Sequence, residues 1–170
     1  MDATNLANVL GALVLRLGDE LRAAVVGPER DATAMTALVH LSKYPDETIE
    51  GLRVPLALTH SGGVRLVDRL EAAGYVERHE GADARAVALR LTRKGREVAG
   101  AVLARREEVL ARVLRVLSAP EREVLGGLVS RLLVHEVPTA PAAMRTCRLC
   151  DYAACRQCPI GSALGDPATD

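Results

Sequence analysis

Leucines recur every three or four residues near the start of the chain. They are Leu6, Leu10, Leu13, Leu17 and Leu21. This spacing places one apolar face along a helix over residues 4–26, which Gly27 and Pro28 end. The face is long for a helix that only covers a small domain, so we expect part of it to contact another subunit.

Two more amphipathic helices are predicted in the second half of the chain. Thr92 caps the first, which runs to about Leu117. The segment Ser118-Ala-Pro-Glu121 combines a capping box with a proline in the first turn, so it starts the next helix. The side chains expected to be buried on this helix are Val124, Leu125, Leu128, Leu132 and Leu133.

These terminal helices are too apolar to remain as surface, and packing against a second copy is the simplest solution. Residues 4–26 and 92–134 are therefore predicted to form a helical dimerisation domain. The alternative is that the helices pack only within one chain.

Between them, residues 30–91 are predicted to form one small domain. Asp31 or Thr33 caps a helix that Tyr44-Pro45 breaks. A short helix follows over residues 48–54. Two short helices separated by a tight turn, with a basic second one, are typical of a helix-turn-helix arrangement.

The basic helix comes next and leads directly into a β-hairpin. Thr59 or Ser61 caps its start, and Gly74 ends it because glycine adopts the left-handed conformation at little cost. A strand opens at Tyr75, and alternating apolar and polar residues over 87–91 predict its return. The predicted fold class is mainly α (α+β): a winged helix-turn-helix with flanking dimerisation helices.

Charge is distributed unevenly along a chain whose formal net charge is zero. Residues 1–52 hold four basic and eight acidic side chains, whereas residues 53–96 hold nine basic and five acidic ones. The positive excess therefore coincides with the predicted winged helix, where contacts to phosphates would require it. A chance imbalance on a solvated face is the alternative for charge taken alone.

Several functional classes are disfavoured by what the chain lacks. No apolar run approaches the roughly 18–20 residues of a membrane span, and the first sixteen residues do not have the pattern of a secretory signal. We therefore expect a cytoplasmic protein. No paired acid and base, nucleophile triad or phosphate-binding loop is visible, so we expect no enzyme.

All four cysteines occur within twelve residues, spaced C-x2-C-x4-C-x2-C. They are Cys147, Cys150, Cys155 and Cys158. Two such turns place four thiolates around one ion, and a structural zinc site is the favoured interpretation. An iron–sulfur cluster is the main alternative, since Cys158-Pro159 matches the ending of bacterial ferredoxin motifs. A thiol redox switch is the third possibility.

The remaining C-terminal segments are assigned by composition. Residues 135–146 are rich in proline and alanine and are predicted to be a linker. Residues 147–160 form the four-cysteine metal-binding segment, and residues 161–170 are predicted to be a disordered tail.

The order of elements and the segment T-H-S-G-G-V-R-L-V-D-R-L-E-A-A-G-Y-V-E-R resemble the MarR (multiple-antibiotic-resistance regulator) family of bacterial transcription factors. The later segment D-A-R-A-V-A-L-R-L-T-R-K-G-R resembles that family's wing. The resemblance covers about residues 30–134. It implies a triangular homodimer with two recognition helices in successive major grooves of a pseudo-palindromic operator. The four-cysteine segment is outside the common family pattern.

Positions carried over from the resemblance define a predicted DNA-binding set. It comprises Thr59, His60, Ser61, Arg65, Arg69 and Arg85, with Asp83 bracing the wing. An arginine fork reads guanine in the major groove, and an arginine suits the negative potential of a narrow minor groove. Arg69 has the alternative of pairing with Asp68 or Glu71. The wing is shortened, because Glu80-Gly81-Ala82 replaces a second Asp-x-Arg unit of the family.

The leading functional hypothesis is a homodimeric, sequence-specific DNA-binding transcriptional regulator, with repression as the favoured mode. A small ligand, or a metal or iron–sulfur signal at the cysteines, would modulate its affinity for double-stranded DNA. The alternative is a winged-helix protein–protein adaptor with a structural zinc site.

Overall fold

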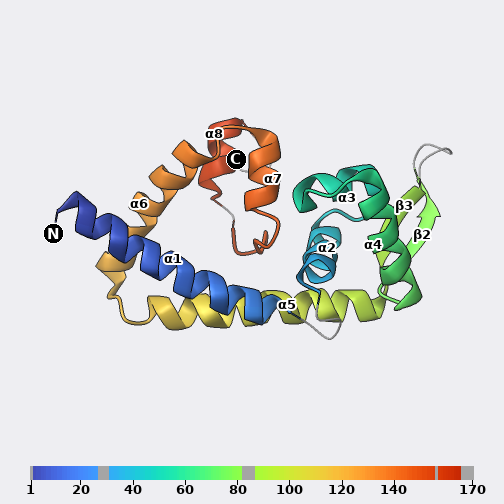
Figure 1. Cartoon of the computed structure of the whole chain (residues 1–170), viewed down its shortest axis with the longest axis horizontal. Coiled ribbons are helices and arrows are strands. Elements are labelled where there is room, and N and C mark those ends of the chain that lie inside the picture. The colour runs from blue at the N-terminus through green and yellow to red at the C-terminus, as the bar shows by residue number, and fades with distance from the viewer. Residues whose placement is uncertain (1, 27–30, 82–86, 156, 166–170) are drawn as a thin grey trace.

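The computed structural model describes residues 2–26, 31–81, 87–155 and 157–165, and within them the chain is mainly helical. The helices are α1 (Ala3–Val25), α2 (Ala32–Lys43), α3 (Ile49–Leu56), α4 (His60–Ala72), α5 (Arg93–Leu114), α6 (Ala119–Glu136), α7 (Ala140–Thr146) and α8 (Pro159–Leu164). The strands are β1 (Glu47–Thr48), β2 (Val76–Glu80) and β3 (Val87–Leu91). This arrangement confirms the predicted mainly α (α+β) class with a winged helix (Figure 1).

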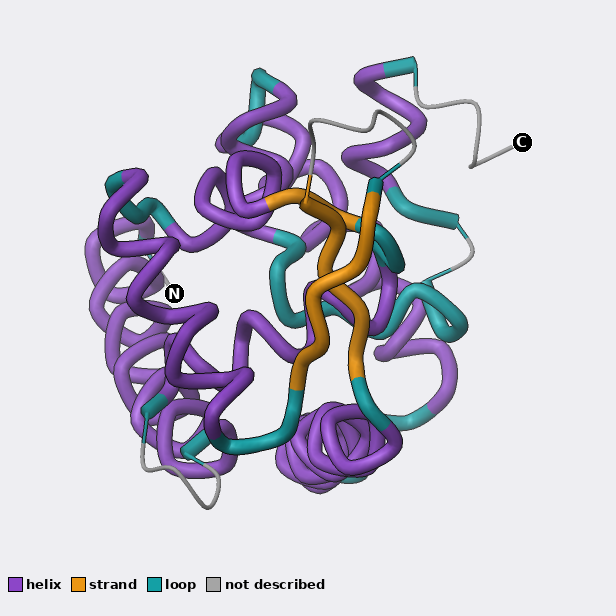
Figure 2. The backbone as a smooth tube through the Cα atoms, turned by 90° about the vertical axis from the view of Figure 1, so that its right-hand side faces the viewer, coloured by secondary structure: helices purple, strands orange, loops and turns teal. Residues whose placement is uncertain are grey.

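The sheet is antiparallel, with β3 in the centre of the order β1-β3-β2. Val76 pairs with Leu91, and Glu47 of β1 pairs with Leu89. Figure 2 shows the two long strands crossing the winged domain, with α5 seen nearly end-on below them. Sequence reasoning did not predict β1, because two residues between helices are too short to show an alternating pattern.

Helix starts follow the side-chain caps that the sequence offers. Asp31 caps α2, accepting hydrogen bonds from the backbone N–H groups of Thr33 and Ala34 at 2.9 and 3.2 Å. Thr59 caps α4, and its hydroxyl accepts from Gly62 N–H at 3.1 Å. For both helices, the capping residue is the first of the two candidates predicted from the sequence.

The core of the winged domain is built from aliphatic side chains of α2, α3, α4 and β3. Its most completely buried members include Met35, Leu38, Leu41, Leu52, Leu66, Leu70 and Leu89. The chain has no tryptophan or phenylalanine, so leucine and valine fill this space. The apolar residues that recur at helical and strand spacing in the sequence are therefore those that form this core.

The start of α5 is locked against the end of α4. The Thr92 hydroxyl donates to the Gly74 carbonyl at 2.7 Å and accepts from Gly95 N–H at 3.0 Å. A Cβ added to Gly95 would lie 2.1 Å from the Tyr75 carbonyl oxygen, so only glycine fits there. This close approach fixes the direction in which α5 leaves the winged domain.

The helices outside the winged domain leave large apolar faces uncovered in a single chain. α1 packs along α5, and α6 turns back from the far end of α5 (Figure 1). No residue of α6 is buried, and Leu128 is 50% exposed. Leu10 on α1 is 47% exposed. Packing within one chain, the alternative considered for these helices, does not cover these faces.

The C-terminal part is more ordered than its composition suggested. The predicted linker 135–146 is wrong in its second half, because Thr139 caps α7 and Pro141 sits in its first turn, where proline is tolerated. The predicted disordered tail 161–170 is wrong at its start, since α8 runs to Leu164 and Gly165 ends it in the left-handed conformation. Residues 166–170 lie outside the described residues.

The described helices include none that combines the length and the apolar character needed to cross a bilayer.

Candidate nucleic-acid interface and cysteine site

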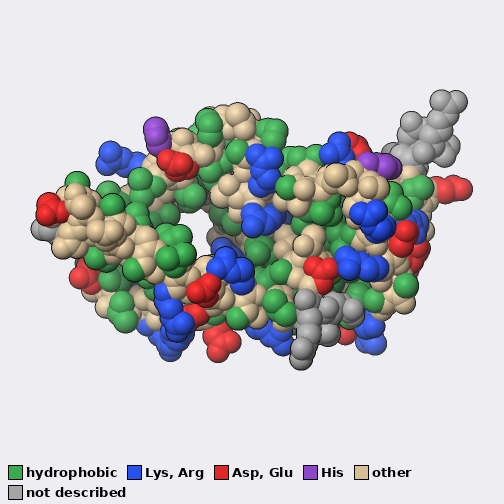
Figure 3. Space-filling view, viewed as in Figure 1, with side chains coloured by type: hydrophobic (Ala, Val, Ile, Leu, Met, Phe, Trp, Pro, Cys, Tyr) green, Lys and Arg blue, Asp and Glu red, His purple; other side chains and the backbone are tan. Residues whose placement is uncertain are grey.

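Helix α4 separates its polar and apolar residues onto opposite faces. Leu66, Val67 and Leu70 are buried in the winged domain. The residues predicted to bind DNA on this helix and at its cap, Thr59, His60, Ser61, Arg65 and Arg69, are all exposed. In the space-filling view, Lys and Arg side chains interspersed with acidic ones lie over the part formed by α3 and α4 (Figure 3).

The first turn of α4 offers hydroxyl and imidazole groups to the solvent. The hydroxyls of Thr59 and Ser61 are 3.3 Å apart. His60 Nδ1 lies 3.5 Å from a carboxylate oxygen of Glu50 on α3. The hydrogen bond from Arg53 is the main cause that lowers the pKa of Glu50 to about 2, and His60 adds to it. Glu50 is therefore a fixed negative charge beside His60 over the physiological range.

Arg65 lies in the middle of the exposed face of α4. Within the described part of the chain, its guanidinium makes no hydrogen bond or ion pair. Five N–H donors are thus presented to solvent from a rigid helix, and this geometry suits a bidentate contact with a base edge or a phosphate.

Arg69, one turn further along α4, is engaged. Its guanidinium pairs with the Asp31 carboxylate at 3.0 Å, which ties α4 to the capped start of α2. The predicted alternative partners, Asp68 and Glu71, instead both pair with Arg78 of β2. Sequence spacing did not reveal either pairing, because the partners are brought together by the hairpin returning over α4.

The hairpin is anchored at its base. Arg90 on β3 pairs through two nitrogens with the carboxylate of Asp46, which precedes β1. This hydrogen bonding holds the pKa of Asp46 below its usual range. The predicted tip residues Asp83 and Arg85 lie outside the described residues.

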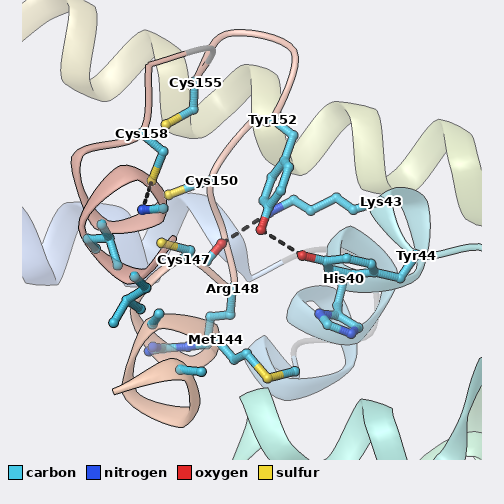
Figure 4. Close-up of a pocket in the computed structure, with 15 residues that line it drawn as sticks. His40, Lys43, Tyr44, Met144, Cys147, Arg148, Cys150, Tyr152, Cys155 and Cys158 are labelled. Carbon is cyan, nitrogen blue, oxygen red and sulfur yellow. Dashed lines mark hydrogen bonds between the residues drawn. The ribbon is translucent and has the colours of Figure 1, made fainter. Parts of the chain in front are cut away.

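The four cysteines are free thiols that come together at a cavity of about 460 Å³ beside α2. Cys147 is the residue that ends α7, and Cys158 is the residue that caps α8. In Figure 4 the four thiols lie together on one side of the cavity, with residues of α2 opposite them. The fold therefore gathers the whole sequence motif at one place.

The thiols are arranged as two pairs. Cys147 donates to Cys150, and this interaction lowers the pKa of Cys150 to about 6 with help from the charges of Arg106 and Lys43. Burial raises the pKa of Cys155, and Cys158 and Cys150 add to this effect. Among the described residues, no three cysteine, histidine or acidic side chains are already spaced as ligands of one ion.

The opposite wall of the cavity contains residues that sequence reasoning missed. Lys43 Nζ donates to the Cys147 carbonyl at 3.1 Å, and the hydroxyls of Tyr44 and Tyr152 are 2.6 Å apart. His40 is buried, with its Nε2 3.6 Å from Glu47, and burial lowers its pKa. The contacts of Lys43 with Cys147 and of Tyr44 with Tyr152 join residues 104 and 108 positions apart, so no local pattern could have indicated them.

This sequence and this fold were compared with those of known proteins. No family model matches the sequence. The transcriptional repressor MprA of Escherichia coli is 31% identical over 104 residues, which are 59% of this chain and 59% of the relative. A MarR family protein from Bacillus stearothermophilus is 27% identical, with a TM-score of 0.68, over 82% of this chain and 99% of that chain. The chain therefore resembles MarR-family proteins in sequence and in fold.

The MarR fold extends to structures of lower identity. FabT of Streptococcus pneumoniae, solved in complex with DNA, is 24% identical and has a TM-score of 0.64, over 77% of this chain and 94% of that chain. At this identity the similarity concerns the fold alone. Because the match covers nearly all of the B. stearothermophilus protein but less of this chain, this chain has residues beyond the architecture that the two share.

Proposed function

We propose that this protein is a member of the MarR family and acts as a homodimeric, sequence-specific DNA-binding transcriptional regulator and repressor. The observation that carries the proposal is the exposed face of α4, a helix packed on the winged-domain core, where the Arg65 guanidinium has no partner among the described residues. The repressor name of the E. coli relative and the DNA complex of FabT support it. Since the chain spans 59% of the length of that relative, its activity as a whole is part of the proposal.

The apolar faces of α1 and α6 support the homodimer. Leu10 and Leu128 are about half exposed in one chain, and a second copy is the partner that would cover both faces symmetrically. A dimer places two α4 helices at a fixed separation, which matches two half-sites one helical turn apart. A small ligand or an ion that alters this separation would change the affinity for DNA.

Arg65→Ala tests the DNA contact directly. If Arg65 reads a base edge, the substitution weakens specific binding by about 1–3 kcal/mol. The measurement is fluorescence anisotropy with DNA from the region upstream of the gene, at several salt concentrations. Arg105→Ala is the matched control, because Arg105 is an exposed arginine on α5, away from α4.

The result also separates the proposal from the adaptor alternative. Salt-sensitive, sequence-selective binding that weakens with Arg65→Ala but not with Arg105→Ala supports the regulator. No selective binding to any upstream fragment, with the dimer intact by light scattering, contradicts it and favours the winged-helix adaptor. A monomer in light scattering contradicts the homodimer.

A further inference from the structure

We propose that the four cysteines at the cavity beside α2 bind one zinc ion, and that this ion joins α7 and α8 into a strut between α6 and α3. The chain has no other cysteines, and all four thiols face this cavity (Figure 4). The four thiols lie outside the winged domain, against α2, and α4 contributes no residue to the lining of the cavity.

The ligand set fits a single tetrahedral ion. With Zn–S bonds of about 2.3 Å, two thiolates on one zinc ion are about 3.8 Å apart, a spacing at which sulfur atoms are in contact. All four cysteines line the same cavity, and only two residues separate the members of each pair, Cys147 with Cys150 and Cys155 with Cys158. The turn of the first pair is closed by a hydrogen bond from Cys150 N–H to the Cys147 carbonyl at 2.9 Å.

Binding requires the two pairs to close on the ion by rotation of their side chains. The protons that now lie between the thiols are replaced by the metal: one Zn²⁺ and four thiols give a dianionic tetrathiolate and four protons, which pass to solvent. No electron is transferred.

The surroundings suit a dianionic site. Lys43 places its ammonium group 3.1 Å from the Cys147 carbonyl oxygen, and the charge of Arg106 on α5 acts on Cys150. Gly161 N–H donates to the Cys158 sulfur at 3.4 Å. Positive charge and N–H donors around ligating sulfurs orient them and stabilise the thiolate form.

The position of the ligands explains what the ion would do. Cys147 ends α7 and Cys158 starts α8, so an ion held by both connects the two helices directly. α7 packs on α3 and α8 packs on α6, as Figure 1 shows. Ile160 is the buried residue of these two short helices, which is too little apolar surface to order them alone. The ion would therefore complete a link between the dimerisation helices and the helix that precedes α4.

This link has a regulatory consequence, which rests on the proposed function. With zinc bound, α3 and the winged domain are held against α6. Without zinc, the strut separates and the positions of the two α4 helices in the dimer are less restricted. Zinc content would then set the affinity for DNA.

The first experiment measures metal in the purified full-length chain, with no DNA present. We expect about one zinc ion per chain by elemental analysis, and tetrahedral thiolate–cobalt absorption bands after exchange with Co²⁺. Cys147→Ser and Cys158→Ser should each lose the metal and the cobalt bands. Ser162→Ala, an exposed change on α8, is the control and should keep both.

Folding of the variants is checked by circular dichroism, and apo wild-type chain is titrated with Zn²⁺ against a chromophoric chelator. If the wild-type chain takes up one Zn²⁺ per chain and retains it against the chelator, the site is supported, even where a variant loses its C-terminal helices. Iron with sulfide in anaerobically purified protein overturns the zinc assignment. Disulfides without metal, or zinc that remains in both serine variants, overturn the site.

The second experiment tests the strut by hydrogen exchange with zinc and after chelation. We expect exchange in α7 and α8 to accelerate about tenfold or more on chelation, with α2 and α4 unchanged. Equal exchange in both states overturns the strut. If the chain binds zinc but no DNA, the proposed function is contradicted and the zinc site is supported. If the chain binds DNA but no zinc, the zinc site is contradicted and the proposed function is supported.

Discussion

The winged domain and the C-terminal helices, α7 and α8, are ordered by different means. The winged domain buries aliphatic side chains contributed by every one of its helices and by β3. In the described residues from 139 to 165, Ile160 alone is buried. The C-terminal segment is held instead by polar contacts to α2 and by packing on α3 and α6.

The difference shows where stability resides in this chain. A domain with a complete apolar core takes most of its stability from the burial of those side chains. The C-terminal segment has less apolar burial, with Ile160 buried and Leu149 packed partly against the core, so it has less of this stabilisation. We therefore expect the winged domain to be the more stable part of the molecule and the C-terminal segment to open more readily.

The largest expected effect comes from removing core volume in the winged domain. Leu38→Ala, at a fully buried position, should reduce the free energy of unfolding by about 2–5 kcal/mol. The measurement is denaturant unfolding followed by circular dichroism. Ile160→Ala is the paired variant, because Ile160 is also buried but lies in α8.

The difference between the two regions is supported if Ile160→Ala does not change the midpoint of the main unfolding transition and increases proteolysis only after residue 139. If Ile160→Ala lowers the main transition as much as Leu38→Ala does, the two regions share one core and the comparison is wrong.

A smaller effect is expected where α5 meets the winged domain. Gly95→Ala forces a Cβ against the Tyr75 carbonyl, so the backbone must shift at a cost of about 1–3 kcal/mol. Thermal unfolding measures the loss. Gly100→Ala is the control, because a Cβ there meets no atom within 4 Å and alanine favours the helix. Equal stability of the two variants would show that α5 is not tied to the winged domain in this way.

The smallest effect is expected at the junction between α2 and the C-terminal segment. Tyr152→Phe removes the hydrogen bond between the hydroxyls of Tyr152 and Tyr44, which is worth about 0.5–1 kcal/mol. Because the bond is exposed, global stability should change little, while hydrogen exchange in α7 should become faster. Unchanged exchange in α7 would mean that packing on α3 alone holds the segment.

The sequence predicted those parts of the fold that depend on periodicity and on local caps. The leucine spacing located α1, the hydroxyls of Thr59 and Thr92 located the starts of α4 and α5, and alternation located β3. The exposure of Arg65 also followed from helical spacing. The roles of the predicted DNA-binding and metal-binding residues remain predictions.

The remaining features depend on contacts between distant residues. Asp31 and Arg69 are 38 positions apart, and nothing in either neighbourhood indicates their pairing. Helices α7 and α8 lie in segments whose proline, alanine and glycine content is typical of loops, so composition predicted a linker and a tail there. Their helices are short and gain their stability from α3 and α6, which a local pattern cannot show.

The contact between Tyr44 and Tyr152 also makes the protein its own optical probe. The chain has three tyrosines and no tryptophan, so ultraviolet emission comes from tyrosine alone. Two of the three rings meet at the junction of α2 with the C-terminal segment, with their centroids 5.9 Å apart. The third, Tyr75, is buried beneath Lys94 in the winged domain and serves as an internal reference. Undocking of the C-terminal segment should therefore be visible in solution as a change in native fluorescence, without any label.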